Sequence, residues 1–411
     1  MKNFMMLFVA ALVVGACVST LATAQTTNFT DGTSGNSDWA DAGNWDNGMP
    51  TFNGSGPRTA NIDGSFTIDG LGAHKNPGFV AIGYGQWGTI NLSRGTLNVS
   101  RGVTINNESN GTSFLNVGGG SGPAALNVTA TTTTGSSYHG GYPLLMIGTR
   151  NNNAATVSLQ DNGGIALRVP TANTHSWNHL FVGALANTDN ANGTFNLGGG
   201  VLDVGSRSIV IGDHANNSFN FTGGRLENLD SYRRATRVGN INNFNWEDYP
   251  AIATLNQQGG VLAPGTVTEA GGIYTTDPIG TTTIFGDYNA DATSMLEIDI
   301  NSTGYDQVLV ELLASLGGGN ATFDGGVDVS LLDGYEPEPG EFFDILVADT
   351  ALTIADIDNL AIAGDGDWDA SLEGGNTLRL TASSTAVPEP STFALALLGF
   401  VGLVFCFRNR Q

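Results

Sequence analysis

Charged residues in the middle of the chain are the first candidates for chemistry. Asp203, Arg207, Asp213 and Arg225 form the only group that would stack along one face of a repeating fold. Hydrolysis of a glycosidic bond needs an acid and a carboxylate held on either side of that bond. The equivalent positions in neighbouring repeats are mostly Asn, Thr or Ser, so no acid–base pair recurs. We therefore expect no catalytic residue and no enzymatic activity.

Residues that could bind a metal ion are also sparse. His175 and His179 have the i, i+4 spacing that binds metal on a helix, but the segment around them is typical of a loop. The segment Gly364–Asp369 could hold Ca²⁺ through alternating carboxylates, although it lacks the ligand spacing of an EF-hand. We expect no resident cofactor, and at most weak screening of the acidic residues by calcium.

The charge balance of the chain excludes one class of partner. Of its 411 residues, 38 are Asp or Glu and 15 are Lys or Arg, so the net charge is −23. A surface with so few cations cannot displace the counterions of a phosphate backbone, and nucleic-acid binding is excluded.

Residues 79–265 repeat one short unit. Each copy begins with an apolar strand, and these strands are anchored by Ile82, Ile105, Ile147, Val182, Ile211 and Val238. Two further strands follow, separated by Gly or Asn corners that tolerate positive φ, as in 89–99 and 194–204. A single rung cannot bury its apolar positions but stacked rungs can. The pattern predicts an all-β fold, a parallel β-helix (β-solenoid), with a β-sandwich of hairpins as the alternative.

Polar residues and longer segments punctuate these repeats. Triplets of the form N-x-[ST], such as those at Asn91, Asn127 and Asn220, could accept glycans. Asparagines are also expected here at the corners between strands and in ladders of stacked side chains, and this role already explains them. The variable repeat length predicts loops that project from the stack, with 129–142 and 170–178 as the main examples.

The predicted solenoid needs a cover at each end, because exposed end rungs would pair with other chains. Residues 25–78 contain Trp39 and Trp45, whose side chains would cover the first rung as an N-terminal cap. The alternative role for this tryptophan pair is a platform on which sugar rings stack. Residues 266–382 alternate like ordinary strands and carry many acidic residues with one base, Arg379. We interpret them as a β-sandwich-like acidic element docked on the last rungs.

The N-terminal residues 1–24 are typical of a secretory signal peptide. Lys2 precedes an apolar run from Phe4 to Val18, and Ala22-Thr23-Ala24 is a suitable cleavage site. A lipoprotein site at Cys17 and an uncleaved membrane helix are the alternatives. Both cysteines, Cys17 and Cys406, lie in hydrophobic end segments, so the region between them has no disulfide.

The C-terminal residues 383–411 combine a short linker with a segment typical of a targeting signal. Pro388-Glu389-Pro390 precedes the apolar run 393–407, and the basic residues Arg408 and Arg410 follow it. This arrangement resembles the PEP-CTERM sorting signal of exported bacterial proteins. The resemblance implies recognition by an exosortase, a transient or retained membrane anchor, and delivery to the cell surface or extracellular matrix. An ordinary C-terminal anchor would use the same apolar run.

The repeats themselves resemble extracellular β-helical proteins of planctomycete-type bacteria and autotransporter passenger segments. This resemblance covers about half of the chain and rests on its strand-Gly-Gly-strand units. It implies a parallel β-helix. From the sorting signal, the acidic surface and the lack of a catalytic pattern, we expect a non-enzymatic structural or adhesive protein of the cell surface. A module that binds extracellular polysaccharide and, less favoured, a β-helix polysaccharide lyase or hydrolase are the alternatives.

Overall fold

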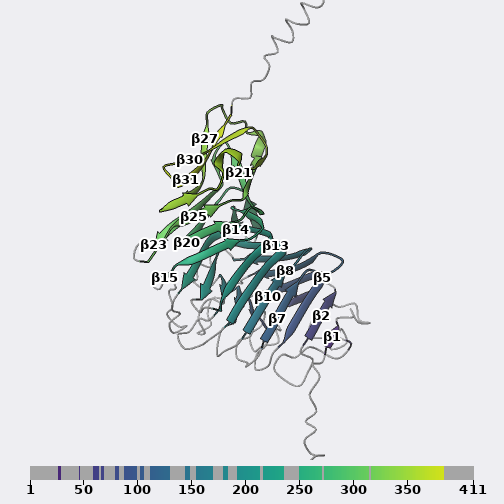
Figure 1. Cartoon of the computed structure of the whole chain (residues 1–411). Coiled ribbons are helices and arrows are strands. Elements are labelled where there is room, and N and C mark those ends of the chain that lie inside the picture. Colours follow the sequence, from purple (N-terminus) through teal and green to yellow (C-terminus); the bar gives the residue numbers. More distant parts are fainter. Residues whose placement is uncertain are drawn as a thin grey trace, which may run out of the picture.

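The protein was described from a computed structural model. The structure describes residues 26–28, 46, 59–63, 66–68, 79–82, 88–99, 102–105, 112–129, 144–148, 154–169, 179–183, 192–212, 216–235, 250–270, 273–313 and 316–383. Nearly all of its regular elements are strands, and a 29-stranded sheet contains all but two of them. Figure 1 shows these strands side by side, from β1 at one end of the stack to β27, β30 and β31 at the other. The all-β prediction is confirmed for these residues.

Three parallel ladders run along this stack, and long strands contribute to more than one of them. Ladder A consists of β1 (Thr26–Asn28), β2 (Thr59–Asp63), the start of β5 (Thr89–Val99), β7 (Thr112–Val117), β10 (Ala154–Leu159), the start of β13 (Asn192–Gly212), the start of β14 (Ser218–Ala235), β16 (Ala253–Gln257), the end of β20 (Thr281–Ala290), β25 (Asn320–Phe323) and β28 (Ala351–Thr353). Ladder B consists of β3 (Phe66–Ile68), the end of β5, β8 (Ala124–Thr129), β11 (Gly163–Arg168), the middle of β13 and of β14, β17 (Gly260–Ala263), β21 (Ser294–Asn301), β26 (Gly326–Leu331) and β29 (Ile362–Gly364). Ladder C consists of β4 (Phe79–Ile82), β6 (Gly102–Ile105), β9 (Leu145–Ile147), β12 (Leu180–Val182), the ends of β13 and β14, the start of β20, β23 (Gln307–Leu313) and β27 (Phe342–Ala348).

The predicted column of apolar anchors is present in ladder C. Successive strands align Ile82, Ile105, Ile147, Val182 and Ile211. All five side chains are buried. The sixth predicted anchor, Val238, lies outside the described residues, and the next strand aligns Arg234 with Ile211.

Alternation along each strand explains the core. The burial pattern of β10 and of β11 switches at every residue, so one face of each strand is buried and the other meets solvent. The buried face of ladder B stacks Leu97, Leu126, Ile165, Leu202, Leu226, Leu262, Leu296 and Val327. Burial of each such side chain stabilises the fold by about 1.5–3 kcal/mol.

The limits of the repeating region differ from those expected. The strands β1, β2 and β3 lie within 25–78, yet they pair in parallel with the repeats. Parallel pairing also continues beyond residue 265, through β20, β21, β25 and β26 to β28 and β29. The expected sandwich-like element at 266–382 is therefore wrong in its strand pairing. Ordinary alternation hid the repeat there, because it identifies a strand without naming its partner.

Among the described strands, antiparallel pairing is confined to hairpins and to the C-terminal end. β15 (Pro250–Ala251), β22 (Gly304–Tyr305) and β24 (Gly317–Gly318) make short antiparallel pairs, and β18 (Thr266–Ala270) pairs with β19 (Ile273–Asp277). At the far end, β27 pairs with β31 (Thr377–Ala382), which pairs with β30 (Trp368–Glu373). Two short 3-10 helices, η3 (Leu332–Gly334) and η4 (Ile357–Asn359), complete the described elements. Leu378 and Leu380 of β31 are buried in the same core as the parallel rungs, and Trp368 of β30 packs against that core.

One glycine corner tests the stacking directly. Gly200 has φ +67°, and a Cβ there would lie 2.2 Å from the carbonyl oxygen of Gly163 in the adjacent rung. Gly375 in the β30–β31 turn has φ +77° with nothing within 4 Å of its Cβ position. We expect Gly375→Ala to lower the free energy of unfolding by about 1–2 kcal/mol, because only the left-handed backbone is strained. Gly200→Ala should lower the free energy of unfolding by at least about 3 kcal/mol, because the added methyl group also pushes the adjacent rung away. Urea denaturation measures the free energy of unfolding of both variants. Equal decreases would contradict close packing of Gly200 against the adjacent rung.

Candidate functional site

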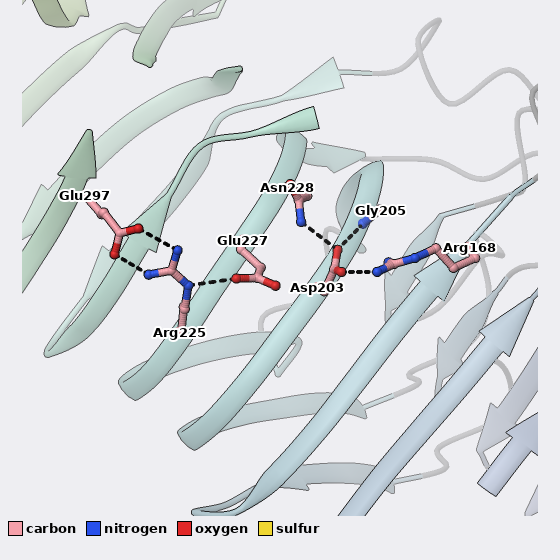
Figure 2. A network of polar contacts seen from close by, with 7 residues as sticks. All are labelled: Arg168, Asp203, Gly205, Arg225, Glu227, Asn228 and Glu297. Carbon is pink, nitrogen blue, oxygen red and sulfur yellow. Dashed lines mark hydrogen bonds and ion pairs between the residues drawn. The ribbon is translucent and has the colours of Figure 1, made fainter. Parts of the chain in front are cut away.

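Charged side chains gather on the outer face of ladder B. Arg168 comes from β11, Asp203 from β13, Arg225 with Glu227 from β14, and Glu297 from β21. Figure 2 shows that these residues project from neighbouring strands and form two groups of polar contacts. They stand on one face because alternate residues of every strand point away from the core.

The first group is centred on Asp203. Its carboxylate forms an ion pair with Arg168 and accepts hydrogen bonds from the Gly205 N–H and from Asn228 Nδ2, each at 3.0 Å. Asp203 is only 7% exposed, so these donors replace the water that it loses. The positive φ of Gly205, +64°, turns its N–H towards this carboxylate at the corner that follows ladder B.

The second group is centred on Arg225. Its guanidinium binds both carboxylate oxygens of Glu297, and its Nε donates to Glu227 Oε2 at 2.7 Å. These hydrogen bonds raise the pKa of Arg225, although partial burial opposes them. The planar fork of arginine suits such bidentate contacts. Residues 72 positions apart in the chain are thus joined.

The predicted cluster of four is only partly assembled. Asp203 and Arg225 share the outer face of ladder B but belong to separate ion-pair groups. Arg207 lies at the start of the ladder C segment, where burial lowers its pKa, and Asp213 lies outside the described residues. The carboxylates of both groups already bind arginine, an arrangement that ties rungs together and leaves little room for an acid–base role.

His179 serves a structural contact. Its Nδ1 accepts a hydrogen bond from the Ser208 N–H at 3.0 Å, so this nitrogen is not available to a metal ion. Burial, with the nearby cations Arg207 and Arg233, lowers the pKa of His179 to about 3. Its predicted partner His175 lies outside the described residues. Within the described part of the chain, no three His, Cys, Asp or Glu residues group closely enough to hold a metal ion.

The acidic segment 364–369 uses its carboxylates within the protein. Asp365 Oδ2 accepts from the Leu331 N–H at 3.1 Å, and Asp369 Oδ2 accepts from the Ser383 hydroxyl at 2.8 Å. The two side chains therefore serve different neighbours. This geometry offers no support for a calcium loop at these residues.

Sequence reasoning missed the buried carboxyl of Asp306. Its two oxygens accept hydrogen bonds from the Gly280 N–H at 2.7 Å and the Asp299 N–H at 3.0 Å. The residue is 1% exposed, and burial, with smaller contributions from Asp299 and Glu297, raises its pKa to about 8. The protonated form is thus favoured in the fold, which makes this group cost stability as the pH rises from about 4 to 8. Nothing in the sequence distinguishes Asp306 from the other acidic residues around it.

Comparison with known proteins concerns the C-terminus. Residues 386–411 match the family model described as the PEP-CTERM protein-sorting motif. The chain carries a PEP-CTERM sorting signal. This signal marks an exported protein that an exosortase recognises and directs to the cell envelope or surface. No curated protein matches the chain.

Several predicted features lie outside the described residues. They are the signal peptide at 1–24, the tryptophans Trp39 and Trp45, the predicted loops at 129–142 (apart from Thr129) and 170–178, and the residues Pro388, Glu389, Pro390, Arg408 and Arg410 within the PEP-CTERM signal. The roles of these residues remain predictions. Among the described residues, no helix is long and apolar enough to cross a membrane.

Substitution of Asp203 tests the first ion-pair group. Asp203→Ala should lower the free energy of unfolding by about 3–5 kcal/mol, because it leaves Arg168, Asn228 and a backbone N–H without their shared acceptor. Glu227→Ala is the matched control, because Glu227 is more exposed and Arg225 keeps Glu297, so its cost should stay below about 1 kcal/mol. Chemical denaturation compares the two. A loss at Asp203 as small as that at Glu227 would show that the group does not stabilise the stack.

The lowered pKa of His179 predicts acid sensitivity. The unfolded chain takes up a proton at this residue near its ordinary pKa of 6.5, whereas the folded chain resists protonation down to about 3. Stability should therefore fall as the pH drops through this window, by a few kcal/mol in total. His179→Gln should remove this part of the pH dependence. Urea denaturation at successive pH values gives the difference between the two proteins, in which the opposite effect of Asp306 cancels. Parallel curves would contradict the prediction.

Proposed function

We propose that this protein is an exported, non-enzymatic β-solenoid that acts as a structural or adhesive component of the cell surface or extracellular matrix. The observation that carries the proposal is the combination of parallel ladders with a PEP-CTERM signal. The parallel ladders give a long, stiff body, and the PEP-CTERM signal directs it to the cell envelope or surface.

The path of the chain supports closure of the ladders into a solenoid. The single long strand β13 contributes first to ladder A, then to ladder B and then to ladder C. The next strand, β14, follows the same order one position along the stack. Between these segments the backbone turns at residues with positive φ, namely Gly200, Gly205 and Ser206 in β13. A chain that visits three ladders in turn and then returns to the first follows a coil.

The chemistry of the outer surface supports a structural role over a catalytic one. The charged groups of ladder B bind one another across rungs, and the most strongly shifted carboxyl, Asp306, is enclosed and held by backbone donors. Catalysis on a large polymer would need an accessible acid–base pair beside a binding cleft. The net charge of −23 keeps such a body hydrated and separate from its copies. The likeness of the repeats to planctomycete-type and autotransporter β-helices fits this role.

The C-terminal segment is proposed as the membrane contact during sorting. The apolar run 393–407, followed by Arg408 and Arg410, would hold the chain in the membrane until an exosortase acts near Pro388-Glu389-Pro390. An ordinary anchor would keep the chain attached through the apolar run whether or not the Pro-Glu-Pro segment is present. The two mechanisms therefore differ in which residues they need.

Two tail variants test this proposal. Deletion of residues 388–411 should abolish surface attachment and release the protein, because both the recognition segment and the apolar run are lost. Replacement of Pro388, Glu389 and Pro390 by alanine keeps the apolar run, and should leave the full-length chain in the membrane without processing. Cell fractionation with immunoblotting measures both. Normal surface delivery of the alanine variant would show that the tail is an ordinary anchor.

A further inference from the structure

The outer face of ladder A carries one repeated pair of polar residues. Seven successive strands align Thr26, Thr59, Thr89, Phe114, Thr156, Thr194 and Ser218 in one row. Two residues further along each strand, they align Asn28, Asn61, Asn91, Asn116, Ser158, Asn196 and Asn220 in a second row. Four of these seven strands carry Thr-x-Asn, and in the other three Phe114, Ser158 or Ser218 replaces one member of the pair. The pairs follow one another at the strand spacing of about 4.8 Å.

The side chains of this face form an ordered lattice of hydroxyl and amide groups. From β5 onward, the buried residue between the two rows leaves both row positions on the solvent side. Asn116 donates to Asn91 and Asn220 donates to Asn196, both at 2.7 Å. Asn289 donates to Asn256 at 3.0 Å, so the asparagine pairing continues further along the ladder. These contacts hold the amides at fixed orientations before any ligand arrives.

The three ladders differ in outer chemistry. Ladder B has one asparagine pair, Asn127 to Asn98, but presents ion pairs further along, and the outward residues Phe181 and Val210 of ladder C are buried. The two rows of ladder A carry no charge over their seven strands, although the chain has a net charge of −23. Asp287, which is aligned with Thr254 further along, is the first charged residue at a row position. A neutral polar lattice does not select for an ionic partner, but it suits one rich in hydroxyl groups.

Phe114 interrupts the hydroxyl row with an aromatic ring. It stands between Thr89 and Thr156 in the register, and 37% of its surface is exposed. An aromatic side chain on the solvent face of a polar row gains nothing from the core. Its apolar ring does match the C–H face of a pyranose ring, while the neighbouring hydroxyls and amides match sugar hydroxyls.

We propose that the outer face of ladder A binds an extended, neutral polysaccharide along the axis of the stack, with Phe114 under one sugar ring. One sugar unit of such a chain advances by about the rise from one rung to the next, so successive units meet successive pairs of row residues. The inference deepens the proposed adhesive function and rests on it. It assigns binding to this face rather than to Trp39 and Trp45.

Binding of neutral and charged sugars by the full chain tests this surface. Calorimetric titration with cellohexaose, a linear neutral glucan, should give saturable binding. Phe114→Thr restores the residue type of the adjacent rungs, so the fold should be kept, and it should weaken binding by about tenfold through loss of the aromatic contact. Thr194→Arg places a bulky side chain further along the row and should also weaken binding. Leu372→Thr is the control, because Leu372 is exposed to a similar extent on β30, outside ladder A, and binding should not change.

Other outcomes would overturn the proposal. No binding of cellohexaose, or equal binding by Phe114→Thr and the unchanged chain, removes the aromatic platform. Tighter binding of an anionic alginate hexamer would show that charge, not the neutral lattice, selects the ligand. Concentration-dependent dimers that Phe114→Thr abolishes, measured by analytical ultracentrifugation, would assign this face to a second copy. Failure of the tail experiment leaves these titrations unaffected, so the two proposals fail separately.

Discussion

The strands of the three parallel ladders depend on the strands above and below them. In a parallel ladder, the backbone N–H and C=O groups find their partners only in adjacent rungs, and an unpaired buried group costs about as much as a lost hydrogen bond. The apolar residues have the same dependence, because a single rung cannot enclose Leu202 or Ile147, which are fully buried in the stack. Stacking therefore satisfies the backbone and the core at once, and everything on the outer surface inherits its spacing.

That spacing makes charge on the outer surface a problem. Asp203 and Glu227 are aligned in adjacent strands, and Glu297 is aligned with Asp328. Like charges directly opposite one another on a sheet are destabilising. Arg168 binds Asp203, and Arg225 lies between Glu227 and Glu297, so each arginine offsets a repulsion that the ladder creates. The ion pairs of ladder B are thus explained by the register, without an appeal to catalysis.

The sequence predicted the contacts that recur and missed those that occur once. The anchors from Ile82 to Ile211 could be aligned because each follows the same local pattern, and the structure stacks them. The limits at residues 79 and 265 were wrong because the flanking strands keep the pairing but lose the glycine-rich pattern. The Arg225–Glu297 contact and the enclosure of Asp306 depend on residues far apart in sequence, and no periodicity connects them.

The regular spacing of the rungs affects charged and neutral outer faces differently. A row of identical charges needs an opposite charge at every rung. The charged residues of ladder B therefore form ion pairs with one another. Neutral hydroxyl and amide side chains repeat without this penalty, and asparagines in register even bond to each other, as Asn116 and Asn91 do. A regular, neutral lattice is therefore the surface chemistry that a stacked fold can extend over many rungs at little cost. Recognition of a periodic partner follows from that regularity, because successive rungs present mostly hydroxyl and amide groups at the same interval.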